Sequence, residues 1–208
     1  MNFLAHLYLS GDDENIMIGN FIADHVKGNN FLPYNERIIQ GIKLHRLIDA
    51  FTDTHPVVEE SKKRLRPNFH KYAPVIVDVF YDYFLARNWK EHHSLNLEQF
   101  VNNAYSVLNR NEMILSARTS RMLQFMTEQN WLYHYSTLEG IDKALTGMSR
   151  RTRFKSNMDK ATLHLKKNHE KFQTEFNLFF PQLKSFCLSH LNQQDSKIQS
   201  EKIILSFP

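Results

Sequence analysis

The segment from residue 38 to residue 56, IIQGIKLHRLIDAFTDTHP, restricts the possible folds more than any other part of the chain. Its apolar residues recur at helical spacing, and His45, Asp49 and Asp53 follow one another at intervals of four residues. Side chains four residues apart lie one above the next on nearly the same face of a helix. Solvated acids pair with Lys or Arg more often than with a histidine and another acid. The segment therefore predicts a helix with a metal-binding face.

Most of the remaining sequence has helical spacing as well. Six Gly and six Pro in 208 residues are too few for a loop-rich β architecture. We expect Asn35 to cap the helix described above, and Pro56 and Pro74 to open the next two helices. Further helices are predicted at about 97–109, 119–135 and 138–149, with a long amphipathic helix at about 155–190. The fold prediction is a single compact all-α domain that spans residues 1–208.

The composition also predicts a compartment. Cys187 is the only cysteine, so an intramolecular disulfide is impossible and an oxidising compartment is not required. The opening MNFLAHLYLS is short and has no basic region before it, unlike a secretory signal. No apolar run approaches the length that spans a membrane. We therefore expect a cytoplasmic protein with no membrane segment.

Several acids and histidines stand inside apolar runs. Asp78 lies between two valines, and Asp82, four residues later, lies between two tyrosines. Asp24 ends the run IGNFIAD, and His6 lies in the first apolar segment. A buried carboxylate without a partner is very costly, and a divalent cation between two carboxylates relieves their repulsion. Oxygen ligands with one or two imidazoles suit Mn²⁺ or Mg²⁺.

Each of these residues also has a simpler interpretation. Asp24 could be an acid at a helix end, and His6 a hydrogen-bonded core histidine. Asp78 could form a salt bridge with Arg46 or Arg87. Taken together, the simpler interpretations are less convincing, because one fold would have to bury six such side chains for unrelated reasons. The six are His6, Asp24, His45, Asp49, Asp78 and Asp82.

The formal charge is +4, but the positive charge is concentrated in one region. Between residues 150 and 171 only Asp159 and Glu170 are acidic. A basic surface there would attract an acidic partner, although a solvated helix face is the simpler interpretation. No recognised nucleic-acid-binding motif accompanies the charge, so we expect no nucleic-acid partner. The basic residues are Arg150, Arg151, Arg153, Lys155, Lys160, Lys166, Lys167 and Lys171.

With these residues assembled, the chain resembles the acyl carrier protein phosphodiesterases over nearly its whole length. The resemblance is most specific in the amino-terminal half and weaker towards the carboxy terminus. It rests on Met1-Asn2-Phe3-Leu4-Ala5-His6-Leu7, Gly19-Asn20, Ala23-Asp24, Gly41-Ile42, His45-Arg46, Ile48-Asp49, Thr52-Asp53, Ala73-Pro74, Asp78, Asp82, Phe84-Leu85, Trp89, Trp131-Leu132, Tyr135, Gly147-Met148 and Arg151.

The resemblance implies an all-helical fold distantly similar to the HD-domain metal phosphohydrolases. It implies hydrolysis of the phosphodiester that joins 4′-phosphopantetheine to a serine of acyl carrier protein, with Mn²⁺ favoured over Mg²⁺. The implied metal ligands are Asp24, His45, Asp49, Asp78 and Asp82. His6 would be a ligand or a proton donor, and Arg46 would contact the phosphate. Because acyl carrier proteins are strongly acidic, Arg150, Arg151 and Arg153 would bind this substrate.

The chain departs from the family pattern at Tyr83, where an Asp-His-Phe-Leu string has histidine. It also lacks the contiguous His-Asp pair of the HD group, so that similarity concerns the fold. Two other functions stay open. The same ligands would serve a phosphohydrolase that acts on a nucleotide or another small phosphodiester. Alternatively, the chain is a non-catalytic module that binds carrier proteins, with its acids in salt bridges. The amphipathic carboxy-terminal helix could pack on the domain or on a second copy.

Overall fold

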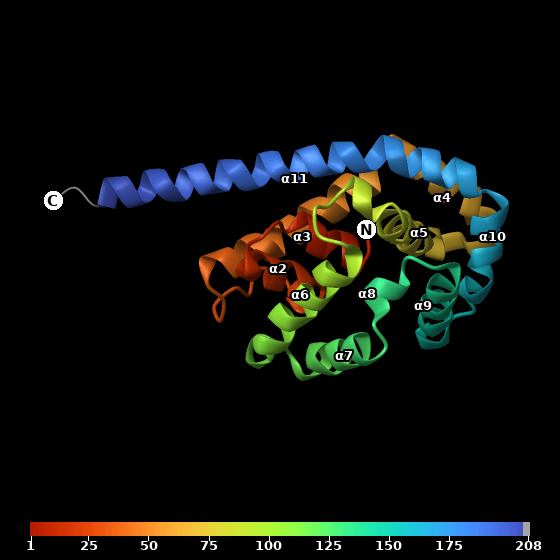
Figure 1. The fold of residues 1–208 in the computed structure, drawn as a ribbon, viewed down its shortest axis with the longest axis horizontal. Coiled ribbons are helices and arrows are strands. Elements are labelled where there is room, and N and C mark those ends of the chain that lie inside the picture. The colour runs from red at the N-terminus through yellow and green to blue at the C-terminus, as the bar shows by residue number, and fades with distance from the viewer. Residues whose placement is uncertain (206–208) are drawn as a thin grey trace.

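The computed structural model describes residues 1–205, and it describes side chains for residues 1–196. Helices form nearly all of this part of the chain, which contains no strand (Figure 1). The fold prediction of a compact all-α protein is thus confirmed. The helices are α1 (Phe3–Leu9), α2 (Glu14–Ile22), α3 (Glu36–Thr54), α4 (Pro56–Phe69), α5 (Ala73–Arg87), α6 (Leu97–Arg110), α7 (Ala117–Glu128), α8 (Trp131–His134), α9 (Leu138–Arg151), α10 (Ala161–Lys167) and α11 (His169–Leu205).

The predicted helix starts agree with the structure at three positions. Asn35 caps α3, because its side-chain oxygen accepts a hydrogen bond from the backbone N–H of Ile38 at 2.9 Å. Pro56 and Pro74 lie in the first turns of α4 and α5, where a missing N–H costs nothing. A single-turn 3₁₀ helix, η1 (Ala23–His25), follows α2 directly and carries Asp24.

Two predicted helices are each divided in the structure. The helix expected at 119–135 is α7 followed by α8, and Asn130 between them has φ 46°. The helix expected at 155–190 begins later, as the short α10, and restarts as α11 after Asn168. Asn157, ahead of α10, also has a positive φ of 55°. Asparagine tolerates this left-handed conformation, which interrupts a right-handed helix.

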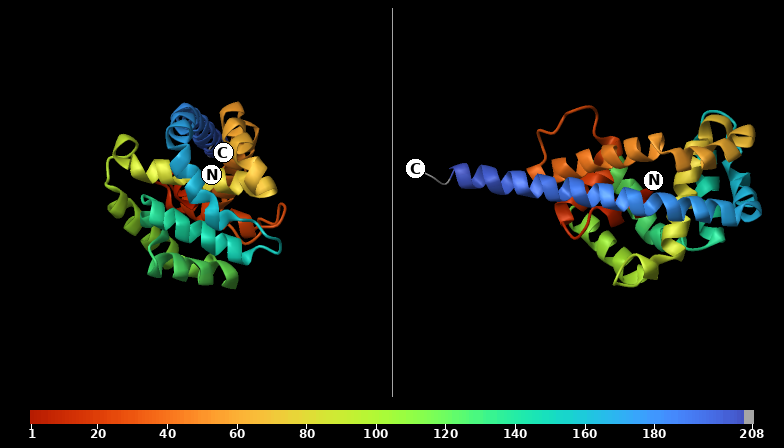
Figure 2. Two further views of the ribbon diagram at one scale, coloured as in Figure 1. Left: turned by 90° about the vertical axis from the view of Figure 1, so that its right-hand side faces the viewer. Right: turned by 90° about the horizontal axis from the view of Figure 1, so that it is seen from above.

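The longest helix, α11, lies across α3, α4 and α5 and continues past the other helices at its carboxy-terminal end (Figures 1 and 2). It continues through Pro181 without a break. Its buried rings pack on α5: Phe172 lies 5.2 Å from Phe80, and Phe176 lies 5.9 Å from Phe84, between ring centroids. Among the described residues, neither α11 nor any other helix is long and apolar enough to cross a membrane.

A close contact joins the backbones of α2 and α3 at two glycines. A Cβ atom on Gly19 would lie 2.0 Å from the carbonyl oxygen of Ile38. A Cβ atom on Gly41 would lie 2.1 Å from the carbonyl oxygen of Ile16. No side chain can be accommodated at either position without movement of one helix. This contact places the end of α2 beside the middle of α3.

The short helix α1 is held in the core by a carboxylate from α5. Asp82, completely buried, accepts hydrogen bonds from the backbone N–H groups of Leu4 at 2.8 Å, Asn2 at 3.2 Å and Ala5 at 3.3 Å. These are amino-terminal N–H groups that have no partner within the helix itself. Burial raises the pKa of Asp82 to about 7, although the three N–H groups favour the charged form. Asp82 therefore fixes the position of α1.

We expect Gly41→Ala to lower the free energy of unfolding by at least about 2 kcal/mol, because the new methyl group would meet backbone atoms of α2. Urea unfolding followed by circular dichroism measures this change. Gly147→Ala in α9 is the matched control, since its Cβ would lie 3.6 Å from the flexible Arg151 side chain. Equal stability of the two variants would contradict a required backbone contact.

Asp82→Asn should lower the free energy of unfolding by about 1–3 kcal/mol, because the amide NH₂ would face a backbone N–H donor. The affinity of the folded variant for Mn²⁺ should fall by at most about tenfold, because Asp82 positions α1 but does not line the metal cavity. Urea unfolding and calorimetric titration with Mn²⁺ measure the two quantities. A stable variant that no longer bound Mn²⁺ would instead make Asp82 a metal ligand.

Candidate metal centre

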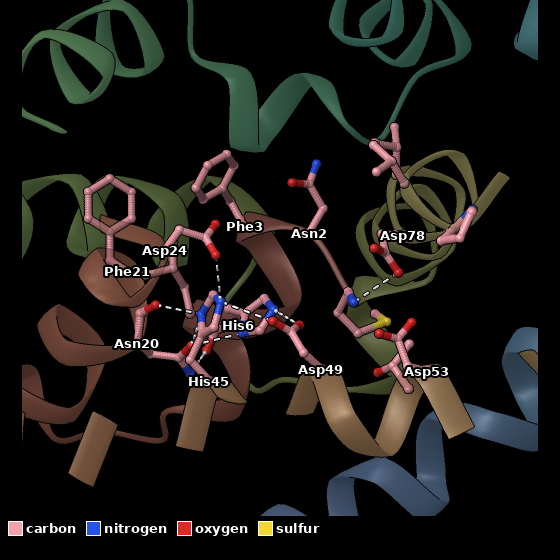
Figure 3. Close-up of a pocket in the computed structure, with 16 residues that line it drawn as sticks. Asn2, Phe3, His6, Asn20, Phe21, Asp24, His45, Asp49, Asp53 and Asp78 are labelled. Carbon is pink, nitrogen blue, oxygen red and sulfur yellow. Dashed lines mark hydrogen bonds and ion pairs between the residues drawn. The ribbon is translucent and has the colours of Figure 1, made fainter. Parts of the chain in front are cut away.

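Five side chains from the amino-terminal helices converge on one cavity of about 350 Å³ (Figure 3). Helix α1 supplies His6 and α2 supplies Asn20, while η1 supplies Asp24 and α3 supplies His45 and Asp49. The two histidine side chains are buried, whereas the side chain of Asp49 is 43% exposed. The cavity is thus open to solvent at Asp49 and extends inward to two buried imidazoles.

The side chain and backbone of Asn20 orient both imidazoles. Its Oδ1 accepts a hydrogen bond from Nδ1 of His6 at 2.8 Å, and its backbone carbonyl accepts one from Nδ1 of His45 at 2.8 Å. Its amide NH₂ is in turn fixed, because it donates to the carbonyl of His6 and to Oγ of Ser10. Both Nδ1 atoms therefore carry hydrogen. The two rings stack with their centroids 4.0 Å apart.

The opposite ring nitrogens face carboxylates. Nε2 of His6 lies 3.2 Å from Oδ1 of Asp49, and Nε2 of His45 lies 3.2 Å from Oδ2 of the same residue. Nε2 of His45 also lies 3.2 Å from Oδ1 of Asp24. The carboxylate of Asp49 therefore contacts both imidazoles. Asp24, on η1, contacts His45 as well.

The proton affinities of the group reflect this crowding. Burial disfavours charge on His45, but hydrogen bonds to Asp24 and Asp49 outweigh it and raise the pKa of His45 to about 9. Burial and the neighbouring His45 lower the pKa of His6. Burial also opposes the charge of Asp49, yet hydrogen bonds from His45 and His6 hold its pKa below the usual range. Without a metal cation, a proton on Nε2 of His45 lies between that nitrogen and the carboxylate oxygens of Asp24 and Asp49.

The donor set fits a divalent metal ion. His6, His45 and Asp49 each offer one ligand atom, and these atoms lie within 4.8 Å of one another. Metal-bound histidines commonly donate their second ring N–H to a fixed acceptor, as both do here to Asn20. Two nitrogens and two carboxylates match Mn²⁺, Fe²⁺ or Zn²⁺ more closely than Mg²⁺ or Ca²⁺, which prefer oxygen ligands alone.

Comparisons with known proteins give the family of this chain. A family model described as acyl carrier protein phosphodiesterase matches residues 1–183. The chain belongs to the acyl carrier protein phosphodiesterase family. Proteins of that name from Photorhabdus laumondii and Serratia proteamaculans are each 32% identical, over 87% and 88% of this chain and 92% and 95% of their own lengths. The protein of that name from an Enterobacter species is 34% identical, over 88% of this chain and 95% of its own length.

Family membership confirms the resemblance found in the sequence. The family match ends at residue 183, inside α11, so the remainder of that helix lies outside the matched region. No solved structure matches the chain. An architecture like that of the HD-domain phosphohydrolases therefore stays a prediction, while the all-α fold is observed directly.

Four of the predicted site residues lie together in this family member: His6, Asp24, His45 and Asp49. His6 was predicted as a ligand or a proton donor. Its Nδ1 contacts Asn20 and its Nε2 contacts Asp49, so neither ring nitrogen is free to protonate a leaving group. The geometry therefore favours a ligand role for His6.

The other predicted acidic ligands lie apart from the four. Asp82 accepts hydrogen bonds from the N–H groups at the amino terminus of α1, and it does not line the cavity. Asp78 lines the far wall, where its Oδ1 lies 3.0 Å from the amino-terminal ammonium of Met1 and not beside Arg46 or Arg87. Asp53 lines the same wall and pairs with Lys62 at 2.8 Å. The helical spacing alone did not distinguish these roles.

Arg46 has a different environment from the one predicted. Its guanidinium donates to the backbone carbonyls of Val26 at 3.1 Å and Gly28 at 2.6 Å, and it lies over the ring of Phe31. Arg46 does not line the cavity. It holds the loop after η1 and thereby supports Asp24, whereas the prediction placed it against the phosphate.

The basic residues predicted to bind substrate are also dispersed. Arg150, Arg151 and Arg153 are exposed at and after the end of α9, and none of them lines the metal cavity. Arg151 lines a second cavity, discussed below. Tyr83, the departure from the family pattern, is buried beside His169 and Arg87, outside the metal cavity.

The sequence analysis did not identify Asn20 as a site residue, although a signal was present. A lone asparagine stands in the apolar run IMIGNFI, next to the glycine that permits the helix contact. A buried amide in such a run needs hydrogen-bond partners. Here the partners are the two histidines and Ser10.

Replacement of Asn20 by alanine should lower the affinity for Mn²⁺ about 10- to 100-fold, because both imidazoles would lose the acceptor that orients them. Isothermal titration calorimetry of the purified protein measures the affinity. Asn102→Ala, at an exposed position on α6, is the control and should bind Mn²⁺ as the wild type does. Unchanged affinity in Asn20→Ala would show that Asn20 has no role at the metal.

Proposed function

We propose that this protein hydrolyses holo-acyl carrier protein to the apo protein and free 4′-phosphopantetheine. The proposal joins the family assignment to the cluster of His6, His45, Asp49 and Asp24. The observation that carries it is the carboxylate of Asp49, whose two oxygens face two oriented imidazoles. This arrangement suits a metal-assisted hydrolase.

The resident metal in this proposal is Mn²⁺, because Mg²⁺, the other ion expected from the sequence, fits two imidazole ligands less well. A divalent ion at this site would supply positive charge for the phosphate oxygens and would activate a water for attack on phosphorus. His6 and His45 would hold that ion through Nε2, and the carboxylates of Asp49 and Asp24 would complete the ligand set. Asn20 keeps both Nε2 atoms turned toward the cavity.

The reaction needs only water as a second reactant. The bond between phosphorus and the serine oxygen breaks, and a bond from a water oxygen to phosphorus forms. The serine oxygen takes up a proton, and 4′-phosphopantetheine leaves with the phosphate. The open side of the cavity, where Asp24 and Asp49 are partly exposed, is where a substrate attached to a protein can reach the site.

The second candidate function is hydrolysis of a small phosphodiester at the same site. The cavity, about 350 Å³, would accommodate a small phosphodiester. A non-catalytic binding module is the third candidate. It would leave the four ligand residues without a metal, held only by the ion pairs between them.

After incubation with this protein and Mn²⁺, holo-acyl carrier protein should lose the mass of its phosphopantetheinyl group. Asp49→Asn should reduce the rate of this loss at least about 100-fold, because the metal loses the ligand shared between both imidazoles. Intact-protein mass spectrometry measures the change. Asp12→Asn, at an exposed acid outside the cavity, is the matched control and should act at the wild-type rate.

Two other results would replace the proposed function. An unchanged carrier-protein mass, with Mn²⁺ bound to the enzyme, would favour hydrolysis of a small phosphodiester. An unchanged mass with no metal bound at any tested concentration would favour the non-catalytic module.

A further inference from the structure

A second cavity, of about 510 Å³, lies on the other side of η1 from the metal centre. The consecutive residues Asp24 and His25 line the two cavities, Asp24 the first and His25 the second. Helix α7, the start of α8 and the end of α9 supply the remaining wall. The lining contains no acidic residue. Its basic and aromatic side chains are His25, Arg118, Arg121, Phe125, Trp131 and Arg151.

The arginines of this cavity have no acidic partner in the described part of the chain. Arg118 and Arg121 are exposed, and Arg151 donates through Nε to the backbone carbonyl of Gly147 at 3.1 Å. Other arginines of the protein are paired with carboxylates: Arg37 with Asp13, Arg64 with Glu175, and Arg110 with Glu14. Three guanidinium groups around one cavity thus lack the carboxylate partners that Arg37, Arg64 and Arg110 have.

Two further features indicate an external ligand. Nδ1 of His25 is buried and has no hydrogen-bond partner within the described structure. Phe125 is 47% exposed, and Trp131 beside it is half-buried. Arginine, tryptophan and other aromatic residues are the types enriched where proteins bind other proteins. The cavity combines this composition with positive charge.

The chemistry of the proposed substrate limits where the carrier protein can contact the enzyme. Its phosphate is esterified directly to a serine, so only Cβ separates the ester oxygen from the carrier backbone. With the phosphate at the metal centre, the carrier backbone must lie within about 5 Å of it, since each bond spans roughly 1.5 Å. The contact surface must therefore border the metal cavity, as the cavity beyond His25 does.

We propose that the cavity of Arg118, Arg121 and Arg151 is the docking site for an acidic surface of the carrier protein. This inference rests on the proposed function and assigns the substrate-binding surface for it. Carboxylates of the carrier would pair with the three guanidinium groups, and apolar residues between them would cover Phe125 and Trp131. Of the basic stretch at 150–171, only Arg151 belongs to this surface.

The double variant Arg118→Glu/Arg121→Glu tests the docking site directly. Binding of fluorescently labelled apo-carrier protein, measured by anisotropy, should weaken at least about tenfold, because like charges would replace complementary ones. Hydrolysis of bis(4-nitrophenyl) phosphate with Mn²⁺, which needs no carrier contact, should proceed at the wild-type rate. Lys166→Glu/Lys167→Glu on α10 changes the net charge equally and should bind the carrier as the wild type does.

Each other outcome has a defined meaning. Equal weakening in the two double variants would show a net-charge effect and overturn the docking site, as would normal carrier binding by Arg118→Glu/Arg121→Glu. Tighter binding of a single-stranded RNA oligonucleotide than of the carrier would overturn it as well. If the wild type binds the carrier through these arginines but leaves holo-carrier protein intact, the docking site stands and the proposed reaction fails.

Discussion

The contact between α2 and α3 at Gly19 and Gly41 is the constraint on which the site depends. Because neither glycine has a side chain, the two backbones touch, and the residue after Gly19 lies beside the middle of α3. Asn20 thereby reaches His45, which lies four residues beyond Gly41, with its backbone carbonyl and its side chain. One helix–helix contact without side chains thus produces both the close packing and the orientation of an imidazole.

The second histidine depends on another long-range contact. His6 lies on a helix of seven residues, which is too short to be stable by itself. The buried carboxylate of Asp82 satisfies the N–H groups at the start of this helix, while Asn20 contacts the carbonyl and the ring of His6 near its end. The start of α1 and Asp82 on α5, nearly 80 residues apart in the sequence, therefore together position Nε2 of His6. A buried acid that supports a helix is distinguishable from a metal ligand only when its partners are known.

Local signals in the sequence predicted much of this structure. The 3.6-residue period predicted the helices, and Asn35 and Pro56 marked their starts correctly because caps act within one turn. The spacing of His45 and Asp49 predicted half of the site, since both residues lie on one helix. Spacing could not separate the contributions of Asp78 and Asp82, because both acids lie on one face of α5. Asp78 contacts the ammonium of Met1, whereas Asp82 contacts the first N–H groups of α1. Asn130 and Asn157 interrupt the helices by adopting a left-handed conformation, which a hydrophobic periodicity does not predict.

The charges on the two sides of η1 have opposite signs, and this division has a chemical reason. Asp24, Asp49, Asp53 and Asp78 all line the metal cavity, whereas the neighbouring cavity has three arginines and no acid. Two like charges 4 Å apart near a protein surface repel by about 4 kcal/mol, so an anionic phosphate would be repelled from these carboxylates. A divalent cation reverses the sign of the field at that point. The arginines beyond His25 attract an acidic protein without competing for the metal, because the turn of η1 separates them from its ligands. In the proposed function, the two cavities together bind a ligand that is anionic both at its phosphate and across its protein surface.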